Sequence, residues 1–205
     1  MRIRLPLEDR SVLKELRAGD EVYIDGIVVT MRDLGHRRAL EMIRRGEPLP
    51  IDLRNGGIFH AGPIALREDG SWRIVSIGPT TSARMDVYVY DLVKELGIAV
   101  IMGKGGMGPN AVRACRDFGC VYLELIGGTA SLITRSVKRV LAVHWLDLGI
   151  PEAMWVLEVE GLGPCIVSID CRGNDIHRED LERARRRAER VVEELLREGL
   201  APTRS

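Results

Sequence analysis

The sequence predicts an α/β fold: a mixed sheet with flanking helices, followed by a C-terminal amphipathic helix. The chain has 205 residues, of which 45% are hydrophobic, so it can bury one sizeable core, and we expect one domain over residues 1–205. Segments with the period of a strand alternate with segments with the period of a helix, which is typical of parallel strands joined by helices. Between residues 179 and 199 the apolar side chains recur close to the helical period of about 3.6 residues.

The first half of the chain reads as strands and helices in alternation. Residues 21–31 are rich in β-branched side chains around a central glycine, which predicts a bent strand. Residues 33–46 place apolar side chains on one face and end at a glycine, which predicts a short helix. Strands are expected at residues 58–66 and 71–79, where glycine–proline pairs end them. Residues 80–97 have an amphipathic helical pattern, opened by two threonines that can cap the first turn.

The second half continues this order and then changes. Residues 98–102 predict a buried strand, residues 109–119 a short helix with a proline near its first position, and residues 120–126 another strand. This β-α-β order favours a parallel region of sheet. Residues 136–173 have little helical period and predict successive strands, so this half is not simply doubly wound. The final helix carries the run "RARRR" with glutamates interleaved around it, so we expect a packed surface helix with a solvated face rather than a nucleic-acid contact.

Composition argues against several classes of protein. Thirty basic and thirty acidic residues give a formal charge of zero, so we expect no nucleic-acid partner and no attraction to a membrane. The N-terminus has no apolar segment of signal-peptide length, and no window is apolar enough for a membrane span, which favours a cytoplasmic location. The four cysteines include no Cys-x-x-Cys pair, so we expect buried thiols, with neither a metal site nor an iron–sulfur cluster held by this chain alone.

A glycine-rich loop follows a buried strand near the middle of the chain. Gly103, Gly105 and Gly108 have the spacing G-x-G-x-x-G, so one hypothesis is a dinucleotide-binding module that uses this loop. Against it, Pro109 delays the start of the helix until after the last glycine, whereas that motif places the helix amides on the pyrophosphate. We favour a loop whose glycines let its backbone and the Lys104 ammonium approach a small anionic ligand.

Several motifs resemble the iron–sulfur hydro-lyases, namely the β subunit or C-terminal catalytic domain of class I fumarate hydratases and L-tartrate dehydratases. The stretch "GPTTSARMDVYVYDLVKELGIAVIMGKGG" is similar to the family signature, which contains GPTT and RMD and ends with GKGG. Further segments resemble the family in the same order: "YIDGIVVTMRDLGHRRA", "GIFHAGP", "GCVYLELIGGTASL" and "VHWLDLGIPEAMWVLEVEGL". The resemblance runs from about residue 5 to about residue 178.

The resemblance implies a swivelling β/β/α domain that is half of an enzyme. In two-subunit members of the family, a separate α subunit supplies three cysteines for a labile 4Fe–4S cluster, and the active site lies between the subunits. The implied reaction is the reversible dehydration of (S)-malate to fumarate, in which the iron acts as a Lewis acid on the hydroxyl, with L-tartrate dehydration as the alternative. The implied partners are the α subunit, in an α2β2 heterotetramer or through a β–β contact, and a small dicarboxylate.

The same resemblance assigns roles to residues. Arg32 and Arg84 are expected to bind substrate carboxylates, because a guanidinium can form two hydrogen bonds with a carboxylate. Lys104 is expected beside them, where it binds a carboxylate or lowers the pKa of a neighbour. The general base carries over to Thr80, and the adjacent Thr81 stays an alternative because sequence cannot orient the two hydroxyls. Thr81, Gly103 and Gly105 are also expected to contact the substrate. Asp33, His36 and Asp86 are expected behind these residues, where they support the arginines.

Simpler interpretations exist for these residues. Arg32 and Arg84 could be surface arginines next to helices, and Thr80 and Thr81 could serve only as helix caps. A scaffold that keeps the fold without the activity is a further alternative. The stretch "GGTAS" places hydroxyl residues where the family often has alanine, and their effect on packing or substrate preference is open. We expect the isolated chain to be inactive and colourless, with an exposed surface around these loops for the α subunit.

Overall fold

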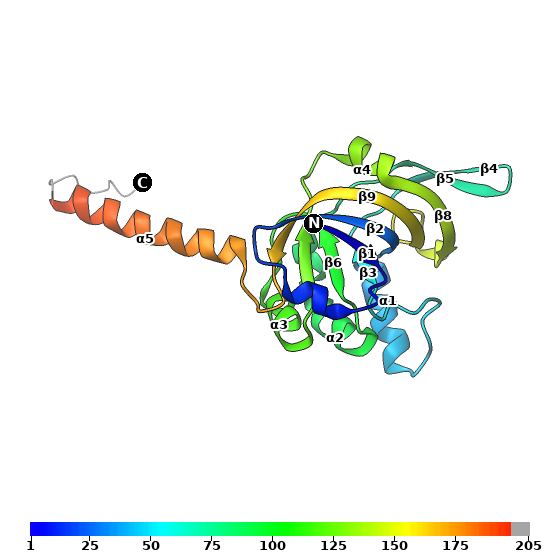
Figure 1. The fold of residues 1–205 in the computed structure, drawn as a ribbon, viewed down its shortest axis with the longest axis horizontal. Helices are drawn as coiled ribbons and strands as arrows, with labels where there is room; N and C mark the ends of the chain where they lie inside the picture. The colour runs from blue at the N-terminus through cyan, green and yellow to red at the C-terminus, as the bar shows by residue number, and fades with distance from the viewer. Residues whose placement is uncertain (198–205) are drawn as a thin grey trace.

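The computed structural model describes residues 1–197, whose strands and helices are shown in Figure 1. The strands are β1 (Arg2–Leu5), β2 (Glu21–Thr30), β3 (Gly57–Phe59), β4 (Ile64–Glu68), β5 (Ser71–Ser76), β6 (Val100–Gly103), β7 (Val121–Glu124), β8 (Val137–His144) and β9 (Met154–Ile169). The α-helices are α1 (Asp33–Arg44), α2 (Asp86–Leu96), α3 (Pro109–Phe118), α4 (Ala130–Ser136) and α5 (Ile176–Arg197). Within these residues, no helix is long and apolar enough to cross a membrane.

Five strands close into a barrel. The order of the main sheet is β1-β2-β3-β6-β7-β9-β8, and β2 also pairs with β9, so that β2, β3, β6, β7 and β9 form a ring. Neighbouring strands from β1 to β7 in this order are parallel, whereas β9 runs antiparallel to β2, β7 and β8. The predicted α/β class, with a mixed sheet, flanking helices and a C-terminal helix, is therefore confirmed.

A single long strand, β9, closes the barrel. The sequence predicts successive strands between residues 136 and 173, but the last two of these are one continuous strand. β9 bends at Gly161 and Gly163, which both have positive φ, and it shifts register against β2 and β8. The bend lets its first half pair with β8 and its last residues pair with β7.

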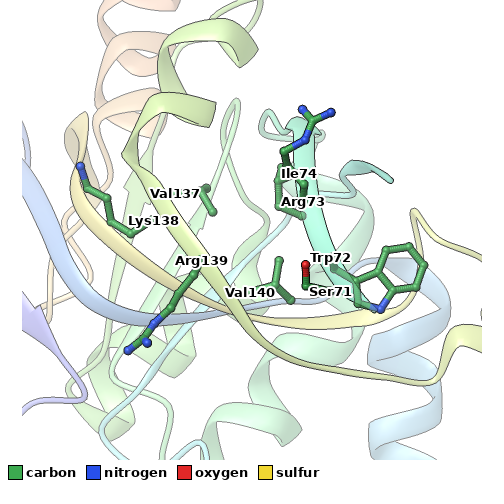
Figure 2. A pocket seen from close by; sticks show the side chains of 8 residues that line it. All are labelled: Ser71, Trp72, Arg73, Ile74, Val137, Lys138, Arg139 and Val140. Carbon is green, nitrogen blue, oxygen red and sulfur yellow. The ribbon is translucent and has the colours of Figure 1, made fainter. Parts of the chain in front are cut away.

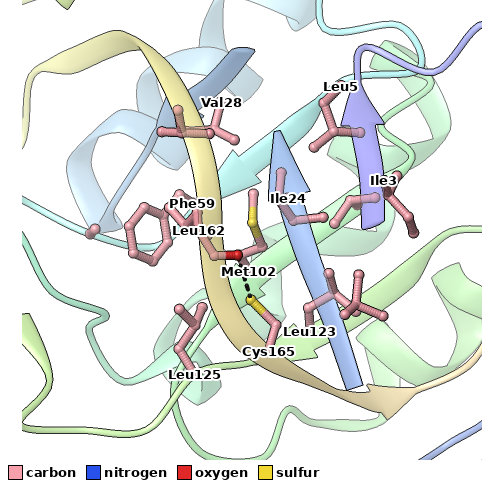
Figure 3. Close-up of a cluster of buried hydrophobic side chains, with 14 of the residues drawn as sticks. Ile3, Leu5, Ile24, Val28, Phe59, Met102, Leu123, Leu125, Leu162 and Cys165 are labelled. Atoms are coloured by element: carbon pink, nitrogen blue, oxygen red, sulfur yellow. Dashed lines mark hydrogen bonds between the residues drawn. The ribbon is translucent and has the colours of Figure 1, made fainter. Parts of the chain in front are cut away.

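Alternate residues of the strands fill the barrel (Figure 3). The inward-facing side chains belong to one buried apolar cluster that includes Val28, Phe59, Met102, Leu123 and Leu162. Their neighbours Val29, Ile58 and Ile101 belong to a second buried cluster, shared with residues of α1, α2 and α3. The strand period of two therefore divides the apolar residues between the barrel interior and the layer beneath the helices.

The predicted strand over residues 58–66 is broken in the structure. β3 ends at Phe59 and β4 begins at Ile64, and the turn between them contains the glycine–proline pair. β4 pairs with β5 in a separate hairpin, and Trp72 of this hairpin packs edge-on against Trp155 of β9 with ring centroids 5.1 Å apart. β1 and α4 were not predicted, because each is too short to show a clear period.

Beyond its first turn, the C-terminal helix does not pack against the barrel. All side chains of α5 from His177 to Arg197 are exposed, and Figure 1 shows the helix projecting away from the rest of the chain. The expectation of a packed surface helix is therefore wrong, because an amphipathic pattern reports an apolar face but not the element that covers it. Residues 198 and 199 of the predicted helix lie outside the described residues.

We expect Gly26→Ala to disrupt the contact between β1 and β2. Gly26 has φ of +93°, and a Cβ atom there would collide with the Leu5 carbonyl oxygen. The free energy of unfolding, measured with urea, should fall by about 1–2 kcal/mol from the backbone conformation and by about 1–3 kcal/mol more from the collision. Gly19→Ala is the matched control, since Gly19 has φ of +98° and open space around its Cβ position. Equal losses in the two variants would contradict the collision.

Candidate active site

The candidate site lies where the carboxyl ends of β2, β3 and β6 meet. These strands are parallel neighbours, so Arg32, His60 and Lys104, which follow them, come to the same edge of the barrel. The segment that begins at Thr80 crosses this edge. The Thr80 amide donates to the His60 carbonyl oxygen at 2.7 Å, and the Lys104 amide donates to the Thr80 carbonyl oxygen at 3.1 Å. The Ser82 amide returns a bond to the Lys104 carbonyl oxygen at 3.1 Å.

Arg84 joins Asp33 to Thr80. Its Nε and Nη2 donate to the two carboxylate oxygens of Asp33, each at 3.0 Å, and Nη2 also donates to the Thr80 hydroxyl oxygen at 3.1 Å. The hydrogen bond from Arg84 holds the pKa of the Asp33 carboxyl below its usual value. The side chain of Arg84 is 44% exposed, so the guanidinium is held in place by Asp33 and is still accessible to a ligand. Asp33 thus contacts Arg84, and its role in orienting that arginine toward a substrate stays a prediction.

The two threonines differ in their surroundings. They precede a 3-10 turn over Ser82–Met85, and Thr81 makes no capping hydrogen bond with its side chain. Thr81 is exposed, whereas Thr80 is half-buried and bonded to Arg84. Simple helix capping therefore does not account for this pair of residues.

Arg32 is held from behind by Glu152. The Arg32 Nε lies 3.2 Å from Glu152 Oε1, and Glu152 Oε2 accepts the Leu34 amide at 2.9 Å. A Cβ atom at Gly62 would lie 2.9 Å from both Cδ and Nη1 of Arg32, so this glycine lets the arginine approach the turn after β3. Sequence reasoning missed Glu152 and Gly62, although both lie inside motifs that carry the family resemblance, "GIPEA" and "HAGP".

Lys104 begins the glycine loop and extends along a second glycine turn. A Cβ atom at Gly127 would lie 3.4 Å from Lys104 Cδ and 3.8 Å from Nζ. Gly105 has φ of +69°, its amide donates to Glu124 Oε1 at 3.0 Å, and its carbonyl oxygen accepts the Tyr122 hydroxyl at 2.6 Å. The backbone groups of Gly105 are thus used within the chain. The Glu124 carboxylate binds both the Gly105 amide and His177 of α5. Lys104 forms no ion pair within residues 1–197.

Two buried histidines lie beneath the site. His36 and His60 are fully buried, and their ring centroids are 5.0 Å apart. His36 Nδ1 bonds the Arg32 carbonyl oxygen at 2.8 Å, and His60 Nδ1 bonds the Ser82 hydroxyl at 2.9 Å. Burial lowers the pKa of His36 to about 4 and the pKa of His60 well below its usual value, so both rings are neutral near pH 7. Gly103 is buried in this network, where a Cβ atom would collide with the Ser82 hydroxyl.

Asp86 caps α3 instead of supporting the arginines. Its carboxylate accepts the Ala111 amide at 2.9 Å and the Asn110 amide at 3.3 Å, and a Cβ atom at Gly108 would collide with it. This corrects the expectation that Asp86 orients an arginine, because the carboxylate faces the start of α3. A dinucleotide would place its pyrophosphate at this helix N-terminus, where the carboxylate already binds the amides and repels an anion. The geometry therefore argues against the dinucleotide-binding alternative.

The buried thiols of Cys115 and Cys165 do not suit an iron–sulfur cluster. Cys115 and Cys120 are buried with their sulfur atoms 3.5 Å apart, and the hydrogen bond between them, together with burial, raises the pKa of the Cys115 thiol. Burial raises the pKa of Cys165 to about 12. Such thiols stay protonated, whereas a metal is bound by thiolates. Among residues 1–197, no group of three or more histidine, cysteine, aspartate or glutamate side chains is placed to hold a metal ion.

A surface groove lies between β5 and β8 (Figure 2). It has a volume of about 380 Å³ and is lined by residues 71–74 and 137–140. Its cations are already paired: Arg73 with Glu68, Lys138 with Glu160, and Arg139 with Glu158. None of the lining residues belongs to the candidate site. The strand ends, with an accessible arginine and a lysine outside any ion pair of the described chain, are chemically better suited to an anionic ligand.

Comparison with known proteins agrees with the resemblance of the motifs. A sequence model of the family described as "Fumarase C-terminus" matches residues 1–180. The chain is 40% identical over 183 residues to the L(+)-tartrate dehydratase subunit beta of Escherichia coli K12, which covers 89% of this chain and 90% of the relative. It is 48% identical over 168 residues to a putative L(+)-tartrate dehydratase subunit beta of Methanocaldococcus jannaschii, with 82% and 86% covered. A putative fumarate hydratase class I of Geobacillus stearothermophilus is 39% identical over 183 residues, which are 89% of this chain and 34% of that protein.

The burial of His36 predicts a loss of stability in mild acid. The pKa of His36 is about 4 in the folded protein, compared with 6.5 for a histidine exposed to water in the unfolded chain. Between these two pH values the unfolded chain therefore binds more protons than the folded protein. The contribution of neutral His36 to the free energy of unfolding is complete above the pKa of the unfolded chain. It falls by up to roughly 3 kcal/mol as the pH approaches the pKa of the folded protein. Urea unfolding at neutral pH and at about pH 5 should show a smaller drop for His36→Gln than for the native chain. An equal drop in His36→Gln and in the native chain would contradict the assignment.

Proposed function

Because the chain belongs to the fumarase C-terminal family, we propose that it catalyses the reversible dehydration of (S)-malate to fumarate together with a partner subunit. The chain is a β subunit of the fumarate hydratase and tartrate dehydratase type, whose members are hydro-lyases. The observation that carries the proposal is the grouping of Arg32, Arg84, Lys104 and Thr80 at one edge of the barrel. L-tartrate is the second candidate substrate, favoured by the names of the relatives from E. coli and M. jannaschii.

The three cations suit a substrate with two carboxylates. Each charged hydrogen bond between a guanidinium and a carboxylate contributes about 1.5–3 kcal/mol. Arg32 is paired through Nε with Glu152, and Arg84 is bonded through Nε and Nη2 to Asp33, so the groups left to bind a ligand are the Nη atoms of Arg32 and Nη1 of Arg84. In the proposed complex, each arginine binds one substrate carboxylate. Lys104 stabilises the negative charge that accumulates on one carboxylate as the neighbouring carbon loses its proton.

Thr80 is the proposed general base. A hydroxyl accepts a proton from carbon only where nearby positive charge and a dry pocket favour its alkoxide. Arg84 Nη2 donates to Thr80 Oγ1 at 3.1 Å, although Asp33 offsets part of that positive charge. Lys104, whose backbone amide donates to the Thr80 carbonyl oxygen, forms no ion pair within residues 1–197 and brings a further positive charge to this edge of the barrel. Thr80 Oγ1 takes the proton in dehydration and returns it in hydration. Its contact with Arg84 supports Thr80 over Thr81.

An α subunit is the proposed source of the other half of the site. The names of two relatives describe subunits beta, and burial raises the pKa of the Cys115 and Cys165 thiols, which does not suit cluster ligands. We therefore assign the 4Fe–4S cluster of this enzyme family to the α subunit. In this proposal, residues 1–205 form a single swivelling β/β/α domain that works in the cytoplasm within an α2β2 heterotetramer.

Turnover by the assembled enzyme tests the substrate. We expect the chain, co-expressed with its α subunit and reconstituted without oxygen, to show a higher kcat/KM for malate and fumarate than for L-tartrate. The chain alone should be inactive and colourless. An equal or higher kcat/KM for L-tartrate would assign the enzyme to tartrate instead. Full activity of the isolated chain would overturn the two-subunit proposal.

Alanine variants of the two threonines test the base in the same assembled enzyme. Thr80→Ala is expected to lower kcat by about a hundredfold or more, because it removes the proton acceptor. Thr81→Ala is the matched control and should stay within about threefold of the native rate, because its side chain is exposed and outside the Arg84 contact. A large loss only in Thr81→Ala would move the base to Thr81. Native rates in both variants would favour a chain that serves as a scaffold.

A further inference from the structure

The apolar face of α5 is uncovered within residues 1–197. Five large apolar side chains of the helix are between 40% and 56% exposed, namely Leu181, Val191, Val192, Leu195 and Leu196. All five lie beyond residues 1–180, the part that matches the family. The helix projects from the body of the protein and is accessible along its length (Figure 1). The face therefore calls for an explanation outside the fold that the family shares.

The exposed face has the repeat of a coiled coil. Leu181, Ala188 and Leu195 lie seven residues apart, and Ala184 and Val191 occupy the intervening positions. Spacings of three and four residues place these five seam residues on one side of the helix, namely Leu181, Ala184, Ala188, Val191 and Leu195. Ion pairs between residues four apart occupy the polar side: Arg178 with Glu182, Arg186 with Glu182, and Arg197 with Glu193. The helix thus has one internally paired polar face and one apolar seam.

This seam is complementary to itself when a second copy runs antiparallel. If Ala188 of one copy lies opposite Val191 of the other, then Ala184 lies opposite Leu195, and symmetry repeats both layers. Each of these four layers then combines one large and one small side chain. Such layers fill the space between two helices without a void or an overlap.

Charged residues beside the seam favour this register over the alternative one, in which Leu181 lies opposite Val191. In it, Arg187 of one copy lies beside Glu194 of the other, twice by symmetry. Neither residue takes part in an ion pair within the described part of the chain. The alternative register, with Leu181 opposite Val191, would bring Arg187 beside its own copy and Asp180 beside Glu194. Both of those contacts are repulsive.

We propose that α5 forms an antiparallel two-helix coiled coil with α5 of a second copy of this chain. This self-association is independent of the proposed catalytic function. Its starting point is held in place, since His177 Nε2 lies 2.6 Å from Glu124 Oε2 and Gly106 packs against the His177 ring. One helix pair buries less than the roughly 1,200–2,000 Å² of a stable interface, so we expect a reversible dimer with a micromolar dissociation constant.

A charge exchange tests the pairing in the full chain. Sedimentation velocity across micromolar concentrations should show a monomer–dimer equilibrium for the native chain. Arg187→Glu should weaken the dimer by about tenfold or more, because a glutamate then faces Glu194 at both symmetric positions. The double variant Arg187→Glu/Glu194→Arg restores opposite charges, and its dissociation constant should return to within about threefold of the native one. Arg190→Glu, the same charge change on the polar face, is the control and should dimerise as the native chain does.

A change in the seam itself gives a second test. Leu195→Glu buries a charge in an apolar layer and should abolish the dimer, while circular dichroism verifies that the helix is retained. The proposal is overturned if the native chain is monomeric at every concentration, or if the double variant stays as weak as Arg187→Glu. It is also overturned if these variants dimerise normally and lose binding to the α subunit, because that subunit would then be the occupant of the seam.

Discussion

The candidate site depends on backbone hydrogen bonds that join Thr80 to His60 and to Lys104, residues from three separate segments of the chain. These bonds fix the segment between β5 and α2 across the ends of two parallel strands, and the turn that follows carries the arginine bonded to Thr80. They form because Gly103 has no side chain: a Cβ atom there would collide with the Ser82 hydroxyl and displace the segment. The glycine that ends β6 thus controls the position of a hydroxyl on a different segment.

Burial beneath this edge decides which groups carry charge. His36 and His60 are fully buried and neutral, because burial lowers the pKa of both rings. The side chains of Arg32 and Arg84 are nearer the surface, 26% and 44% exposed, and a guanidinium group carries a permanent positive charge. The positive charge of the site therefore faces outward and does not change as the histidines titrate. Acidification instead acts on the fold, since His36 must leave its buried position or bind a proton there.

Local patterns in the sequence predicted the elements whose side chains are buried by a regular local period, such as single strands of the sheet. The apolar runs at residues 98–102 and 120–126 became β6 and β7, and two of the motifs contain Thr80 and Lys104, which backbone hydrogen bonds join in the structure. The roles of the motif residues in binding and catalysis stay predictions. The errors concern long-range contacts. β9 is one strand because it pairs with β2, β7 and β8 at once, which no local period encodes. Asp86 meets amides of α3, and α5 lacks a cover, for the same reason: a pattern identifies side chains that avoid water but not the distant segment that they meet.

The proposed chemistry requires a drier environment than residues 1–197 provide. The side chains of Arg84 and Asp33 are 44% and 34% exposed, and in water such a pair contributes only about 0–1 kcal/mol. An alkoxide at Thr80 needs a stronger field, which water weakens through its high dielectric constant. A subunit that covers this edge and the 65% exposed Ile126 beside it would exclude water. The interactions of Arg32 and Arg84 would then become stronger without any movement of the two side chains. Assembly would then activate a geometry that the β chain already has, because its alignment comes from backbone bonds and its field strength from the exclusion of water.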